Sequence, residues 1–288
     1  MKKKLSISDL QAMMERNEKA AWMTAYDAPF ASYCERAGMD MILVGDSMGM
    51  IVYGLDGTVP VTMDMCINHC KAVRKGAPNT FVIGDMPFGS YHASCEDAVN
   101  NAVRFLKEAD MDAIKLEGGV RVADKIRAIS DAGIVVFGHV GLTPQSTAAM
   151  GGFKAQGRTT DSAKAVIEDA IAVYESGARA MLMEGIPEEV GQFIAELIPI
   201  PCYGIGAGVH NDGEVLVMGD ALGMFDAFTP KFVKKFANIS EIAIEAYKEY
   251  IKEVKEKTFP AEEHKYKFSG DQADLEKMFT EIKKEFKE

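Results

Sequence analysis

The 288-residue sequence lacks any apolar run near the roughly 20 residues that a transmembrane helix needs. Its first stretch, MKKKLSISDLQAMMERNEKA, carries charges where a secretory signal peptide has its apolar segment. The sequence also lacks an excess of basic residues, since 43 acidic side chains outnumber 32 Lys and Arg and give a net charge of -11. This balance argues against nucleic acid and anionic membranes as partners. We therefore expect a cytoplasmic protein.

Cysteine is scarce as well, with five residues and no CxxC pair. Cys66 and Cys70 lie four residues apart, with His69 between them, on a segment expected to be helical. A structural zinc site would need more ligands nearby than this segment supplies. We therefore interpret the segment as a partly buried helix face rather than a metal site.

What the sequence does contain is a series of short apolar runs separated by segments of helical character. Strands that are apolar throughout are typical of a parallel sheet covered by helices. Eight such runs alternating with helices predict an α/β protein, a closed (β/α)8 TIM barrel rather than a doubly wound open sheet. The expected strands cover residues 21–25, 40–45, 80–84, 112–116, 134–138, 179–183, 201–205 and 221–225. The expected helices cover residues 28–37, 62–75, 95–109, 120–131, 161–176, 188–197, 212–218 and 230–256.

The two ends of the chain are expected to add a helix each. SISDLQAMMERNEK predicts an amphipathic helix, capped by Ser6 or Ser8, that closes the bottom of the barrel. We assign residues 1–268 to a single catalytic barrel domain. Residues 269–288, SGDQADLEKMFTEIKKEFKE, predict a charged amphipathic helical extension, either solvated on the surface or in contact within an oligomer.

Polar side chains end or follow five of the apolar runs. Active sites of (β/α)8 barrels lie at the C-terminal ends of the strands, so these side chains should converge on one mouth. They are, in chain order, Asp46 and Ser47, Asp85, Lys115 and Glu117, His139, and Glu184.

Lys115 and Glu117 lie two residues apart in AIKLEGG, so a strand would send both into the barrel interior. Ile114 and Leu116 would then face the helices. One interpretation is a structural ion pair between the two charged residues. That pair alone would leave the neighbouring carboxylates without an explanation.

The carboxylates of Asp46, Asp85 and Glu117 would repel one another in a low-dielectric cleft unless a cation joined them. Hard oxygen ligands without clustered His or Cys favour Mg²⁺ over Zn²⁺. Few protein ligands would also leave positions for water and an oxygen-bearing substrate. Because a single Gly-Asp after a strand can equally cap a helix, that alternative stays open.

Two further residues of the predicted mouth could take part in proton transfer. Glu184 has Met181 and Met183 beside it, and desolvation by them would raise its pKa toward that of a general base near neutral pH. The alternative is a carboxylate that caps the helix starting near Pro187. His139 could be a pocket residue or a core histidine that is satisfied by the backbone.

The residues assembled so far lie in a set of motifs that covers nearly the whole expected barrel. They are TAYDAPFA, ILVGDSMGM, TVPVTMDMCINHCKAVRKGAPN, IGDMPFGSY, IKLEGG, GHVGLTPQ, GGFKAQGR, EGIP, YGIGAG and FPAEEH. In this order the chain resembles the ketopantoate hydroxymethyltransferase (3-methyl-2-oxobutanoate hydroxymethyltransferase) family of pantothenate biosynthesis. The resemblance implies a Mg²⁺-dependent barrel enzyme that transfers a hydroxymethyl group from 5,10-methylenetetrahydrofolate to 3-methyl-2-oxobutanoate, giving 2-dehydropantoate. It also implies a homo-oligomer, a decamer.

The resemblance assigns roles to the strand-end residues. Asp46 and Asp85 match the direct metal ligands, and Glu117 matches a third carboxylate at the metal that acts directly or through water. Asp46, Ser47, Asp85 and Lys115 match positions that bind the 2-oxo acid, and Lys115 would add a positive charge beside the developing oxyanion. Glu184 matches the proton acceptor, and His139 would lie near the new hydroxymethyl group.

Two other functions compete with this hypothesis. A Mg²⁺-dependent 2-oxo acid aldolase or lyase on a related barrel would use the same carboxylates but no folate. A barrel kept only for binding or assembly is disfavoured, because it has no physical reason to retain every carboxylate that the chemistry needs. The sequence does not indicate which residues bind the folate.

Overall fold

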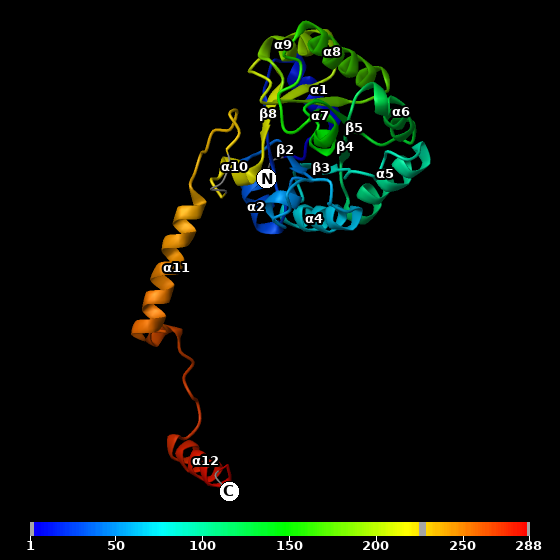
Figure 1. The fold of residues 1–288 in the computed structure, drawn as a ribbon. Coiled ribbons are helices and arrows are strands. Elements are labelled where there is room, and N and C mark those ends of the chain that lie inside the picture. The colour runs from blue at the N-terminus through cyan, green and yellow to red at the C-terminus, as the bar shows by residue number, and fades with distance from the viewer. Residues whose placement is uncertain (1–2, 225–228, 287–288) are drawn as a thin grey trace. The chain divides into compact units, whose positions relative to one another are not determined.

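A computed structural model of the protein describes residues 3–224 and 229–286. Eight parallel strands pair in chain order and close into a barrel, as the ribbon in Figure 1 shows, so the predicted (β/α)8 fold is confirmed. The strands are β1 (Ala20–Thr24), β2 (Met41–Val44), β3 (Phe81–Asp85), β4 (Ala113–Glu117), β5 (Val136–Gly141), β6 (Ala180–Glu184), β7 (Cys202–Ile205) and β8 (Gly213–Leu216).

Helices connect the strands and form the outer layer of the barrel (Figure 1). Several begin at a side chain that accepts a backbone hydrogen bond, as Asp27, Thr62 and Ser94 do before α2, α4 and α5. The α-helices of this part of the chain are α1 (Ile7–Glu15), α2 (Ala28–Ala37), α3 (Met48–Ile51), α4 (Met63–Gly76), α5 (Cys95–Ala109), α6 (Ala123–Asp131), α7 (Thr147–Met150), α8 (Thr160–Glu175), α9 (Glu188–Leu197) and α10 (Met218–Ala221). Two short 3-10 helices are η1 (Val120–Val122) and η2 (Pro144–Ser146).

The eighth strand lies earlier in the chain than the sequence predicted. Residues 213–216 form β8, where a helix over 212–218 was expected, so that expectation is wrong. The strand expected at 221–225 is also wrong for residues 221–224, which end α10 and follow it as a turn, and residue 225 lies outside the described residues. The apolar run there packs as helix and turn, whereas β8 carries the partly polar sequence GEVL.

The interior of the barrel is filled mainly by large apolar side chains. Trp22, Phe137 and Tyr203 meet there, with ring centroids 5.4 Å apart for Trp22 and Tyr203 and 6.2 Å apart for Phe137 and Tyr203. Leu10 and Met13 of α1 belong to the same buried cluster. The cluster includes the first residues of several strands, so α1 closes the N-terminal end of the barrel, as predicted. Ser6 caps α1 through a capping box with Asp9.

A second apolar cluster lies between the strands and the surrounding helices. It contains Ile114 and Leu116 of β4, as the alternation along that strand predicted. Cys66 and Cys70 lie in the same cluster as buried free thiols on α4, so the interpretation of their segment as a partly buried helix face is confirmed.

The chain divides into two compact units, Met1–Ala237 and Asn238–Glu288. The second unit contains α11 (Ile239–Glu256), the 3-10 helix η3 (Glu262–His264) and α12 (Gln272–Glu285). The helix expected at 230–256 thus begins at residue 239 and belongs to the second unit rather than to the barrel. The extra C-terminal helix is present as α12, and the domain boundary between residues 268 and 269 stays a prediction.

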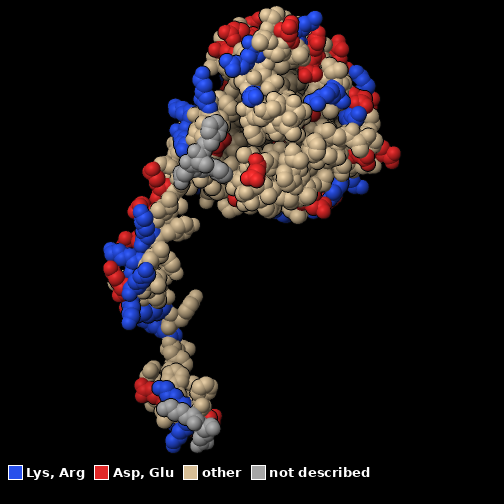
Figure 2. All heavy atoms as spheres, viewed as in Figure 1, with Lys and Arg blue, Asp and Glu red and all other residues tan. Residues whose placement is uncertain are grey.

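Acidic and basic side chains are mixed on the surfaces of both units. In the barrel unit, the centre of the face seen in Figure 2 is largely uncharged. The helices of the second unit carry both signs of charge and also expose apolar side chains such as Ile242, Tyr247 and Phe279.

Among the described residues, no helix is both long enough and apolar enough to cross a membrane.

Candidate active site

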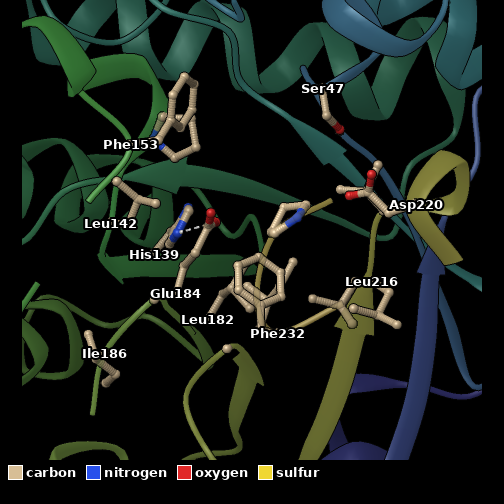
Figure 3. A pocket seen from close by; sticks show the side chains of 18 of the residues that line it. Ser47, His139, Leu142, Phe153, Leu182, Glu184, Ile186, Leu216, Asp220 and Phe232 are labelled. Carbon is tan, nitrogen blue, oxygen red and sulfur yellow. Dashed lines mark ion pairs between the residues drawn. The ribbon is translucent and has the colours of Figure 1, made fainter. Parts of the chain in front are cut away.

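A cavity of about 870 Å³ opens at the C-terminal ends of the barrel strands. All seven predicted strand-end residues line it, so their expected convergence on one mouth is confirmed, whereas their roles stay predictions. Figure 3 shows His139 and Glu184 pointing toward each other, while Ser47 and Asp220 project from other elements of the lining.

Parallel pairing sets the neighbours in this cluster. In the strand register Asp85 lies beside Lys115, and Glu117 lies beside His139. The next pair of strands places Gly141 beside Glu184. Side chains that are far apart in the sequence therefore meet because adjacent strands end at the same level.

Asp46 and Asp85 are two deeply buried acidic residues of the mouth, with exposed fractions of 4% and 1%. The Asp46 backbone N–H donates to Asp85 Oδ2 over 3.0 Å. Burial raises the pKa of Asp46, and the charges of Asp85 and Glu117 raise it further. Burial also raises the pKa of Asp85, against the opposing effect of Lys115. Without a further cation, both carboxylates are therefore costly to keep ionised.

Lys115 lies among the carboxylates on the interior face of β4, as predicted. Its Nζ is 2.8 Å from Asp85 Oδ1 and 3.6 Å from Glu117 Oε1. Burial disfavours the charged ammonium, but Asp85, Glu117 and Asp46 outweigh it and raise the pKa of Lys115. The ion pair with Glu117 considered from the sequence is therefore present, as part of a larger cluster in which Asp85 is the nearer partner.

Glu117 is held by several groups at once. Its Oε1 lies 3.5 Å from His139 Nδ1, and its Oε2 accepts a hydrogen bond from the Gln145 backbone N–H over 3.0 Å. Burial alone would raise the pKa of Glu117, but Lys115 and His139 lower it below its usual value. Glu117 is therefore the most strongly stabilised carboxylate of the cluster.

His139 links this cluster to Glu184. Its Nε2 lies 3.3 Å from Glu184 Oε2, and its Nδ1 lies 3.3 Å from Lys115 Nζ. Burial and the Lys115 charge disfavour a protonated ring, yet Glu117 and Glu184 raise the pKa of His139 to about 9. Of the two interpretations, His139 is thus a pocket residue rather than a core histidine satisfied by the backbone.

Glu184 is less buried than its neighbours, with 14% of its side chain exposed to the cavity mouth. The expectation that Met181 and Met183 desolvate it is wrong, because both methionines pack in the outer cluster against the helices. Strand alternation places Glu184 on the opposite face, with Leu182. Helix α9 begins after Pro187 without a side-chain cap, so the alternative of a capping carboxylate is wrong as well.

Ser47 is oriented by a chain of hydroxyl groups. Thr24 Oγ1 donates to the Tyr26 hydroxyl over 2.8 Å and accepts from the Met218 backbone N–H over 2.9 Å. The Tyr26 hydroxyl also lies 2.8 Å from Ser47 Oγ, and either of these two oxygens can be the donor. In the arrangement in which Tyr26 donates, the Ser47 hydrogen is available for an acceptor in the cavity. Ser47 makes no capping bond to α3, so it does not act as a helix cap.

Sequence reasoning missed residues that hold the strand-end side chains in place, notably Tyr26, Gln145 and Tyr91. Gln145 and Tyr91 are buried and contact Asp46 and Glu117 through hydrogen bonds. They carry no charge and do not directly follow a strand. The signal that could have found Gln145 is the GLTPQ segment, which begins at the last residue of β5.

Within residues 3–224 and 229–286, no three His, Cys, Asp or Glu side chains form a ready-made metal site. The neighbouring carboxylates of Asp46 and Asp85 are the groups best placed to bind a cation. Mg²⁺ usually takes one or two carboxylates and completes its shell with water and substrate oxygens. The pair therefore fits a cation whose remaining ligands come from the substrate, and a metal site with Glu117 as third carboxylate stays a prediction.

The chain is similar along nearly its whole length to known enzymes. The model of a family described as ketopantoate hydroxymethyltransferase matches residues 4–262. The 3-methyl-2-oxobutanoate hydroxymethyltransferase of Alkaliphilus metalliredigens is 59% identical over 283 residues, 98% of this chain and 100% of that protein. The enzyme of the same name from Moorella thermoacetica is 49% identical over 264 residues, 92% of this chain and 98% of that protein.

Solved structures are similar in fold. Phosphoenolpyruvate phosphomutase from Streptomyces platensis subsp. rosaceus has a TM-score of 0.59 and 16% identity, covering 99% of this chain and 100% of that chain. A phosphonopyruvate hydrolase complex with oxalate and Mg²⁺ has a TM-score of 0.58 and 12% identity, covering 98% of this chain and 97% of that chain. At these identities the likeness shows the fold alone. The family match and the two close relatives show more: the chain belongs to the ketopantoate hydroxymethyltransferase family.

Proposed function

We propose that the protein transfers a hydroxymethyl group from 5,10-methylenetetrahydrofolate to 3-methyl-2-oxobutanoate, giving 2-dehydropantoate, in a Mg²⁺-dependent reaction. The observation that carries the proposal, beside family membership, is the cluster of Asp46, Asp85, Lys115 and Glu117 at the mouth, with Glu184 across the same cavity. These groups are the ones needed to bind a 2-oxo acid through a cation and to remove a proton from it.

The donor set supports Mg²⁺ as the cation. Asp46 and Asp85 offer hard carboxylate oxygens, and their raised pKa values reflect a repulsion that a divalent cation would relieve. Bound Mg²⁺ would supply Lewis-acid polarisation of the 2-oxo group. Glu117 is already engaged by Lys115, His139 and Gln145, which favours its action through water over direct ligation.

The proton transfer is assigned to Glu184. Its carboxylate would take the proton from C3 of the 2-oxo acid, and the electron pair of that C–H bond would become the enolate. The enolate carbon would then form the new bond to the one-carbon unit of the folate, the C–N bonds that hold this unit would break to release tetrahydrofolate, and water would supply the oxygen of the new hydroxyl group. His139, 3.3 Å from Glu184, would orient the carboxylate and lie near the new hydroxymethyl group.

The oxygen atoms of the bound substrate would face donors of the chain. Lys115 would place a fixed positive charge beside the developing oxyanion, where a preorganised charge lowers the barrier. Ser47 would donate its hydroxyl hydrogen to a substrate oxygen, with Tyr26 donating to Ser47 Oγ. Both groups would therefore bind the 2-oxo acid and hold it with C3 toward Glu184.

An assay with purified protein and 3-methyl-2-oxobutanoate tests the proposal. Product should form only when Mg²⁺ and methylenetetrahydrofolate are both present, and EDTA should stop the reaction. Exchange of the C3 proton into D₂O should need Mg²⁺ but not the folate, because proton removal precedes transfer. Turnover of the 2-oxo acid without the folate would favour an aldolase or lyase instead.

Three further expectations stay predictions. They are the use of the folate as the one-carbon donor, assembly as a decamer, and a cytoplasmic location. The first is tested by the assay above, and the second by sedimentation of the purified protein.

A further inference from the structure

Gln145 lies between two of the buried carboxylates and contacts both. Its side-chain Nε2 donates to Asp46 Oδ2 over 2.8 Å, and its backbone N–H donates to Glu117 Oε2 over 3.0 Å. The same Nε2 also donates to the Met86 carbonyl oxygen over 2.9 Å. One residue of η2, the 3-10 helix after β5, thus joins carboxylates from the ends of β2 and β4.

Tyr91 fixes the orientation of this side chain. Its hydroxyl donates to Gln145 Oε1 over 2.6 Å and accepts from the Glu117 backbone N–H over 3.2 Å. An amide has one acceptor oxygen and one NH₂ group, so a donor at the oxygen requires the NH₂ group to point the other way. Both amide hydrogens are then used, on Asp46 and Met86, and the Gln145 side chain is fully satisfied although it is buried.

A neutral donor suits a carboxylate that must also bind a cation. Lys115 holds Asp85 with a full positive charge, which reduces the negative potential there. Gln145 holds Asp46 by a hydrogen bond without neutralising its charge. Hydrogen bonds to charged groups are among the stronger ones, so this contact can fix the rotamer of Asp46.

We propose that Gln145 is a positioning residue of the cation site, which holds Asp46 and Glu117 at a fixed spacing, with Tyr91 setting the direction of its amide. The inference rests on the proposed function, because it requires that a divalent cation binds at Asp46. Residues that orient metal ligands typically change metal affinity by about 10- to 100-fold when they are replaced.

Mn²⁺ binding measures this effect without turnover. Calorimetric titration of Mn²⁺ into the protein with 3-methyl-2-oxobutanoate should give a Kd about 10- to 100-fold higher for Gln145→Met than for the unchanged protein. Tyr91→Phe keeps the ring and removes the hydroxyl, so its Kd should rise less. Tyr91→Phe should add little further loss to Gln145→Met, since Tyr91 acts largely through Gln145.

A matched control separates positioning from general stability. Ile126→Val removes one methylene from a buried side chain of α6 that packs against the outer face of the barrel. It should lower the midpoint of thermal unfolding but leave the Kd for Mn²⁺ unchanged. If Gln145→Met does not fold, the Kd of Tyr91→Phe for Mn²⁺ tests the inference by itself.

Two outcomes would overturn the inference, and they differ in what else they affect. Mn²⁺ affinity within about twofold of the unchanged protein in both variants would refute the role of Gln145 while leaving the proposed function intact. Failure of the unchanged protein to bind Mn²⁺ in the presence of the 2-oxo acid would refute the metal-dependent function, and this inference with it.

Discussion

Replacing Lys115 with methionine should destabilise the metal-free protein strongly at neutral pH. The Lys115 ammonium lies 2.8 Å from Asp85 and 3.6 Å from Glu117, and at most 3% of any of these side chains is exposed. Removing one member of a buried ion pair costs about 3–5 kcal/mol, because its partner stays buried without compensation. We therefore expect the free energy of unfolding to fall by about that amount at pH 7.

The sign of the pH dependence follows from the neighbouring pKa values. Asp46 and Asp85 have raised pKa values in the folded protein, so their favourable contribution is complete below the ordinary value of 3.8 and is lost as pH rises through the folded value. Lys115 lowers the pKa of both aspartates and of Glu117, so its removal lets them protonate at higher pH. The loss of stability on substitution should therefore be small near pH 4 and largest at pH 7.

Urea unfolding followed by circular dichroism measures this loss, in EDTA and at one protein concentration. Lys164→Met is the matched control, because Lys164 is 75% exposed and pairs with Glu168 only at 3.7 Å. Surface substitutions of this kind change stability by less than about 0.5 kcal/mol. Equal unfolding free energies for Lys115→Met and the unchanged protein at pH 7, or a larger difference at pH 4 than at pH 7, would refute the reasoning.

Three other substitutions test the site and the strand that carries it. Glu184→Gln should slow exchange of the C3 proton of 3-methyl-2-oxobutanoate into D₂O by about 100- to 10,000-fold, the usual contribution of a general base, while calorimetry shows that the 2-oxo acid still binds. Asp85→Ala should abolish the Mg²⁺-dependent part of that binding, a larger effect than the roughly 10- to 100-fold loss typical of supporting residues. Gly84→Ala should lower the free energy of unfolding in urea by about 1–3 kcal/mol, because its Cβ would lie 2.3 Å from Cδ1 of buried Phe105. Gly57→Ala is the control and should leave that free energy unchanged, because its Cβ would have no atom within 4 Å.

Each of these three predictions has an outcome that would contradict it. Rapid exchange in Glu184→Gln would mean that another group is the base. Unchanged Mg²⁺-dependent affinity in Asp85→Ala would remove that residue from the metal site. Equal stability of the Gly84 and Gly57 variants would show that Phe105 moves aside without cost.

Much of the fold, and the convergence of the seven strand-end residues on one cavity, were predictable from the sequence. Seven strands are largely apolar runs, and the rule that active sites lie at the C-terminal ends of barrel strands then selects the polar residues that end or follow five of them. The strand alternation in AIKLEGG correctly sent Lys115 and Glu117 inward. These predictions succeed because both signals are local in the sequence.

The errors come from elements whose local sequence conflicts with their place in the fold. Strand β8 follows a polar loop and carries the exposed residue Glu214, so its sequence pattern is not typical of a buried strand. Pairing with β1 on one side and β7 on the other makes it a strand nonetheless. Gln145 was missed for a related reason: its importance lies in contacts with Asp46, 99 residues away, which no local pattern reveals.

The charge distribution suggests why the cluster uses one lysine and one glutamine. Asp46, Asp85 and Glu117 would together make the barrel mouth strongly repulsive, and Lys115 offsets this by contacting Asp85 and Glu117. A second basic side chain beside Asp46 would stabilise the fold further. It would also cancel the negative charge that would attract a metal ion. Gln145 instead fixes Asp46 by a hydrogen bond and leaves its charge in place. Under the proposed function, Lys115 would mainly stabilise the metal-free fold, whereas Gln145 would mainly set the affinity for a cation.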